Sequence, residues 1–178
     1  MRYAAKEINF GVLYGMGTYG LSWRAGIPHW QAKEFIEKYF QEFAGVKKYI
    51  DRTLAFTKKE GYCETLFGRR RYLPELASSN YQLRAGAERM AVNHPIQGTA
   101  ADLMKLAMIE VHNEITKLQN PAIKMILQVH DELVLEIPKN AVSETSALLK
   151  KTMEGVVKLR VPVKVEVKTG HNWGEMEK

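Results

Sequence analysis

Residues 125–137 of the chain read MILQVHDELVLEI, two apolar runs separated by a charged triplet. Each run has the length and composition of a β-strand, and the triplet His130-Asp131-Glu132 stands where the chain would reverse. An unpaired charge is costly to bury, so such groups are usually solvated, paired or bound to a metal ion. The segment therefore predicts a hairpin. Its two acidic residues are either solvated at the turn or presented to a metal ion.

The other periodic patterns predict helices around short strands. Helices are expected over residues 2–14, 29–43, 46–60, 80–118 and 143–157, with an interruption near Pro95 in the longest. Strands are expected before and after a turn at Gly68, and again over residues 161–170. This order favours an α+β fold in which a small antiparallel sheet is backed by long helices, with a helical portion at the N-terminus.

The charge distribution limits the class of partner. Residues 1–75 hold 13 Lys and Arg against 8 Asp and Glu, a balance of +5, whereas residues 76–178 hold 13 against 12, a balance of +1. This asymmetry favours a polyanion such as nucleic acid or nucleotide phosphates, although a solvated surface would give the same count.

The remaining composition favours a cytoplasmic globular protein. The apolar fraction is 46% and the charged fraction 26%. No apolar run approaches the ~20 residues of a membrane span, and the N-terminus does not resemble a signal peptide. Cys63 is alone, which excludes an internal disulfide and zinc sites built on paired cysteines.

Four residues spaced four apart stand out near the N-terminus: Arg2, Lys6, Phe10 and Tyr14. On a helix they share one face, so two cations could hold phosphates and two aromatic rings could hold a sugar or base. The alternative is an amphipathic helix that places Phe10 and Tyr14 in a core.

The segment RYAAKEINFGVLYG, which contains these four residues, resembles motif B of the family A DNA polymerases, the bacterial DNA polymerase I group. LQVHDELVLE resembles motif C of that family, and ETLFGRRRYLPEL and AERMAVNHPIQGTAADLMK resemble further segments in the family's order. The resemblance implies the C-terminal part of a polymerase domain, with the remainder of the fingers in residues 1–58 and the palm in residues 59–178. It implies a bacterial or phage protein of the nucleoid.

The resemblance also implies a role for each matching residue. Arg2 and Lys6 would contact the phosphates of a dNTP, Phe10 would pack on its sugar and base and discriminate against chain terminators, and Tyr14 would guard the insertion site. Asp131, supported by Glu132, would hold a catalytic pair of Mg²⁺ ions. The residues expected to contact primer-template DNA are Arg69, Arg70, Arg71, Arg89, Asn93, Gln97 and His130.

The second metal-binding carboxylate has no obvious candidate. Two-metal phosphoryl transfer needs carboxylates from more than one position. Asp51 and Asp102 do not lie in a strand resembling the family's motif A, DYSQIELR. We therefore expect a polymerase fragment that lacks motif A, is inactive alone and is completed by an N-terminal part in the same chain or another.

Three other functions are compatible with parts of this pattern. A nucleic-acid-binding fragment without catalysis would need only the basic face and the hydrogen-bonding residues. A single-subunit RNA polymerase shares the general layout of motifs B and C, but not the Asn-Phe-Gly of residues 9–11. A metal-dependent phosphohydrolase is disfavoured, because the five histidines do not show the spacing of metal ligands.

Overall fold

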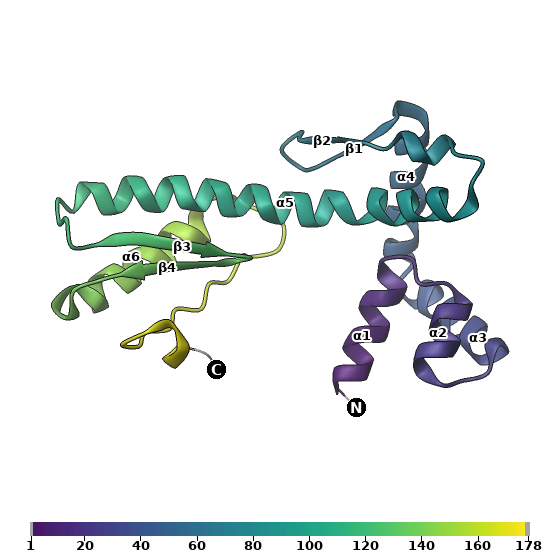
Figure 1. The fold of residues 1–178 in the computed structure, drawn as a ribbon, viewed down its shortest axis with the longest axis horizontal. Helices are drawn as coiled ribbons and strands as arrows, with labels where there is room; N and C mark the ends of the chain where they lie inside the picture. The colour runs from purple at the N-terminus through teal and green to yellow at the C-terminus, as the bar shows by residue number, and fades with distance from the viewer. Residues whose placement is uncertain (1, 177–178) are drawn as a thin grey trace. The chain divides into compact units, whose positions relative to one another are not determined.

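The computed structural model describes residues 2–176, with side chains for residue 6 and residues 8–176. Its elements are, in chain order, α1 (Arg2–Leu13), α2 (Thr18–Ala25), α3 (His29–Glu42), α4 (Ala44–Glu60), β1 (Tyr62–Glu64), β2 (Arg70–Tyr72), η1 (Pro74–Ala77), α5 (Tyr81–Lys117), β3 (Lys124–Val129), β4 (Glu132–Glu136), η2 (Lys139–Ala141), α6 (Val142–Gly155) and η3 (Trp173–Glu175) (Figure 1). Two antiparallel two-stranded sheets accompany the helices, so the predicted α+β class is confirmed. The chain forms two compact units, residues 1–99 and 100–178, divided within α5.

Helices α1, α2 and α3 pack around a small apolar core in the first unit. Val12, Leu21 and Ala32 are buried there, one from each helix. The sequence patterns did not predict α2, because Gly17 and Gly20 make its sequence read as a loop. Burial of Leu21 against the neighbouring helices outweighs the low helix propensity of this segment.

The remainder of the first unit joins the β1–β2 hairpin to α4 and α5. Tyr62 pairs with Tyr72, and the connecting turn contains Gly68 in the left-handed region at φ +78°, as the prediction of a turn there required. The core beneath it consists of Cys63, Leu73, Leu76, Ala87 and Ala91. The hairpin is therefore fixed to α5 by buried apolar contacts.

Helix α5 runs without a break through Pro95, so the predicted interruption is wrong. Proline lacks an amide donor and crowds the carbonyl four residues earlier, which usually kinks or ends a helix. Here Tyr49 donates a hydrogen bond to the Val92 carbonyl at 2.7 Å, and Thr99 donates to the carbonyl of Pro95 itself. Ala91 and Val92 are buried, and packing of this stretch outweighs the local cost of proline.

The second unit confirms the predicted hairpin at residues 124–136. Strands β3 and β4 pair antiparallel with Val129 opposite Glu132, and a bulge falls between Met125 and Leu127. The hairpin packs beside the C-terminal half of α5 and α6, around a core of Val111, Ile115, Ile123 and Leu149 (Figure 1). Ile126 and Leu127 remain about half exposed (51% and 46%), so the sheet also presents an apolar surface to solvent.

The strand predicted over residues 161–170 is not formed. Its alternating valines have the period of a strand, but a strand also needs a partner for its backbone hydrogen bonds. Val161 is 72% exposed, and the amide of Val165 donates instead to a carboxylate oxygen of Glu154 at 2.9 Å. In residues 2–176, no helix combines the length and apolar character needed to cross a bilayer.

Candidate nucleic-acid interface

Helix α1 presents a cation and two aromatic rings in a row. The Lys6 Nζ lies 5.9 Å from the centroid of the Phe10 ring, and the Phe10 and Tyr14 rings are stacked with centroids 6.1 Å apart. Phe10 is 42% exposed, whereas the core of this helix is built on Val12. Phe10 is therefore not a core residue, and the row is available to a ligand. The side chain of Arg2 lies outside the described part of the structure.

Gly15 permits the end of α1 to approach α5 closely. Its φ of +92° lies in a region that other residues rarely adopt. A Cβ built at this position would lie 3.3 Å from Cγ of Arg89. Both the backbone conformation and the limited space therefore favour glycine after Tyr14.

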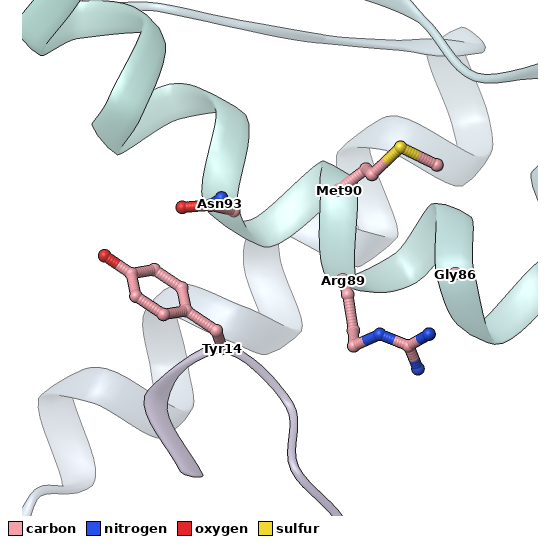
Figure 2. A pocket seen from close by; sticks show the side chains of 5 residues that line it. All are labelled: Tyr14, Gly86, Arg89, Met90 and Asn93. Atoms are coloured by element: carbon pink, nitrogen blue, oxygen red, sulfur yellow. The ribbon is translucent and has the colours of Figure 1, made fainter. Parts of the chain in front are cut away.

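A pocket of about 390 Å³ lies beside this contact. Tyr14 lines it from the end of α1, and Gly86, Arg89, Met90 and Asn93 line it from α5 (Figure 2). The Asn93 Oδ1 atom is buried and has no hydrogen-bond partner among the described residues. A buried acceptor without a donor is costly, so this unpaired oxygen distinguishes Asn93 among the residues that line the pocket.

The basic turn predicted at residues 69–71 lies in the β1–β2 hairpin. The Arg70 guanidinium lies 4.4 Å from the centroid of the Tyr62 ring, and its Nε is 3.5 Å from a carboxylate oxygen of Glu64. Arg71 donates a hydrogen bond to the Met90 Sδ at 3.0 Å, so it contacts a residue that lines the pocket. All three arginines are exposed, as a site for phosphate groups requires.

The turn of this hairpin is docked on α5 through two buried threonines. The Thr65 hydroxyl accepts hydrogen bonds from the amides of Phe67 and Arg69, and the Thr99 hydroxyl accepts one from the amide of Leu66 at 3.0 Å. At Gly98, a Cβ would lie only 2.6 Å from Cγ2 of Thr65. Gly98 therefore lets the basic turn lie against the helix directly after Gln97, which is itself exposed.

In the second unit, His130 and Asp131 form the two-residue turn between β3 and β4. His130 adopts φ +53°, a conformation that costs a residue other than glycine about 1–2 kcal/mol. The Gln128 side-chain amide donates to the His130 carbonyl at 2.6 Å and supports the turn. A positive φ is what a two-residue hairpin turn requires of its first residue, so this conformation holds His130 and Asp131 at the tip of the hairpin.

Asp131 and Glu132 are exposed and offer the hard oxygen ligands that Mg²⁺ prefers. Among the side chains that the structure describes, no group of three or more His, Cys, Asp or Glu is arranged to hold a metal ion. The two acids therefore fit part of a magnesium ligand set.

Comparison with known proteins identifies the family. The profile of DNA polymerase family A matches residues 1–175. The chain belongs to this family. It is 53% identical over 173 residues to the thermostable DNA polymerase I of Thermus aquaticus, covering 97% of this chain and 20% of that protein. It is 52% identical over 172 residues to DNA polymerase I of Deinococcus radiodurans, covering 97% of this chain and 18% of that protein.

A solved structure matches in fold as well. The POL domain of Pol1 from M. smegmatis, in a complex with DNA primer-template and dNTP, superimposes with a TM-score of 0.93 and 41% identity, covering 98% of this chain and 31% of that chain. The resemblance stated from motifs B and C is thereby confirmed. The chain spans about a fifth of the length of the curated relatives it matches.

Sequence reasoning on this family A chain missed three residues around the pocket. Gly86 and Met90 line it, and Tyr49 is hydrogen-bonded to the adjoining turn of α5. Gly86 carried a usable signal, since glycine inside a helix costs about 1 kcal/mol and needs a reason. Met90 and Tyr49 carried none, because both have the character of ordinary core residues.

Proposed function

We propose that this chain is part of a template-directed DNA polymerase that adds deoxynucleotides to a primer 3′-hydroxyl, in the bacterial nucleoid. Membership of family A and the names of the relatives support this function. The observation that carries it is the pocket in which Tyr14, at the end of motif B, meets Arg89 and Asn93. This pocket combines an aromatic ring, a cation and a side-chain amide, which suits a nucleotide base beside its phosphate.

In this proposal, α1 binds the incoming dNTP. Lys6 and Arg2 contact its phosphates, because both cations precede the aromatic residues on one helical face. Phe10 packs on the sugar and base, which its 42% exposed ring allows. Tyr14 stacks at the edge of the insertion site.

Primer-template DNA would lie against α5 and the basic turn. Arg89, Asn93 and Gln97 stand four apart on α5 and offer donors and acceptors to bases in the minor groove. The basic turn, residues 69–71, would contact backbone phosphates and supply salt-sensitive affinity without sequence preference. His130 would face the DNA from the second unit. Residues 1–58 would then be a part of the fingers and residues 59–178 the palm.

The turn at Asp131 and Glu132 would hold Mg²⁺. When bound, a pair of these ions activates the attacking hydroxyl and stabilises the leaving oxygen in phosphoryl transfer. Asp131 offers a carboxylate at the tip of a short turn, where a ligand can bind without disturbing the strands. We propose that the second carboxylate comes from a residue outside these 178, so that the isolated chain binds DNA without extending a primer.

Primer extension tests the function. A chimera in which this chain replaces the matching segment of Thermus aquaticus DNA polymerase I should extend a labelled primer with Mg²⁺ and four dNTPs, whereas the isolated chain should not. In the chimera, Asp131→Asn should lower the extension rate by about a hundredfold or more, since a metal ion contributes several kcal/mol to the transition state.

The control for this variant is Asp51→Asn, which makes the same change at an exposed residue paired with Lys47 on α4. It should leave the rate unchanged. A folded chimera that binds DNA and does not extend primers would instead support a non-catalytic nucleic-acid-binding role.

A further inference from the structure

One hydrogen bond joins α4 to the part of α5 that lines the pocket. The Tyr49 hydroxyl donates to the Val92 carbonyl at 2.7 Å, across 43 residues of sequence. Val92 is 5% exposed and immediately precedes Asn93. The bond therefore restrains the backbone at the residue whose side-chain oxygen is buried without a partner among the described residues.

This restraint acts on a turn of α5 that is otherwise weakened. Pro95 lies three residues beyond Val92 and cannot donate an amide hydrogen bond within the helix. A donor from another helix can hold such a turn in one conformation. Tyr49 supplies such a donor from α4 on the side of the pocket, while on the C-terminal side of the proline Thr99, within α5 itself, donates to the Pro95 carbonyl.

The Tyr49 hydroxyl is suited to remain a donor. Burial raises the pKa of the Tyr49 phenol above its ordinary value of 10.0, against a hydrogen bond with Thr53 that lowers it. Tyr49 therefore remains a hydrogen-bond donor to the carbonyl directly before Asn93.

We propose that Tyr49 is a positioning residue for primer-template DNA, acting through the Val92 carbonyl to hold Asn93 toward the pocket. The inference rests on the proposed function. It assigns Tyr49 to the orientation of a hydrogen-bonding group, so the loss of its hydroxyl weakens a contact to DNA without removing any phosphate contact.

A double-mutant cycle on the 178-residue chain tests this role. Binding of a fluorescein-labelled primer-template is measured by anisotropy for the parent, Tyr49→Phe, Asn93→Ala and the double variant. Tyr49→Phe should weaken binding about three- to tenfold, the worth of one neutral hydrogen bond. It should have no further effect in the Asn93→Ala background, because its action passes through Asn93.

A matched control is Tyr81→Phe, the same change at a 73% exposed tyrosine that begins α5. It should bind DNA like the parent. The dependence of affinity on salt should also be unchanged in Tyr49→Phe, whereas Arg71→Gln should reduce the slope by about one ion, as loss of a phosphate contact does.

Other results of these binding measurements would contradict either the role of Tyr49 or the proposed DNA interface. Equal weakening by Tyr49→Phe in both backgrounds would indicate a general structural effect and overturn the positioning role. No effect of Tyr49→Phe, with weakening by Asn93→Ala, would overturn the inference and leave the proposed function standing. No effect of Asn93→Ala, or no binding by the parent, would contradict the proposed DNA interface itself.

Discussion

Gly98 should be intolerant of alanine because the basic turn is docked against it. A Cβ at this position would lie 2.6 Å from Cγ2 of Thr65 and 3.1 Å from Cε1 of His94. Carbon atoms prefer separations of about 3.5–4.0 Å, so the first contact overlaps by about 1 Å. Thr65 is 5% exposed, and its hydroxyl holds two amides of the turn, so its methyl group cannot rotate away freely.

The magnitude follows from two opposing effects. Overpacking of this kind costs about 1–3 kcal/mol, whereas alanine improves helix propensity over glycine by about 1 kcal/mol. Gly98→Ala should therefore lower the free energy of unfolding of the first unit by up to about 2 kcal/mol. In a Thr65→Ser background, which removes Cγ2 and keeps the hydroxyl, the same change should cost at least about 1 kcal/mol less.

Urea unfolding followed by far-ultraviolet circular dichroism, compared for the parent, both single variants and the double variant, measures this difference. Amide exchange at Leu66 provides a local measurement, because that amide donates to Thr99 beside the contact. Gly45→Ala is the control: Gly45 lies in α4 with nothing within 4 Å of its Cβ position, so this variant should be neutral or more stable. If Gly98→Ala had the same effect in the parent chain and in the Thr65→Ser background, the steric explanation would be wrong.

Three further predictions concern single residues. Gly15→Ala should destabilise the first unit by about 1–2 kcal/mol in thermal unfolding, because alanine is strained at φ +92° and would crowd Arg89; unchanged stability would contradict this. His130→Gly should leave stability unchanged or raise it by up to about 1 kcal/mol, because relief of the positive φ is offset by backbone entropy, while DNA binding weakens. Burial raises the pKa of the Cys63 thiol above 9.0. The protonated thiol therefore contributes its full stabilisation of the folded chain below pH 9, and this contribution is lost as the pH rises through the folded-state pKa. Alkylation at pH 8 should accordingly be slow in the folded chain and rapid in urea, and equal rates would contradict the burial.

The sequence alone was sufficient wherever a local pattern decides the structure. Two apolar runs around His130 and Asp131 specified a hairpin, since a period of two and a charged turn need only a dozen residues. The spacing of Lys6, Phe10 and Tyr14 likewise specified one helical face. Motifs B and C identified the family, because their residues are consecutive along the chain.

Tertiary structure decided the features that depend on distant residues. Residues 161–170 have the pattern of a strand and form none, because a strand exists only with a partner for its backbone groups. Helix α5 continues through Pro95 in a setting where Tyr49, from α4, donates a hydrogen bond to the Val92 carbonyl. The sequence determined which groups could bind a nucleotide. Contacts between separate helices decided that Tyr14 and Asn93 share a pocket, because these residues are 79 positions apart in the sequence and only the folded chain brings them together.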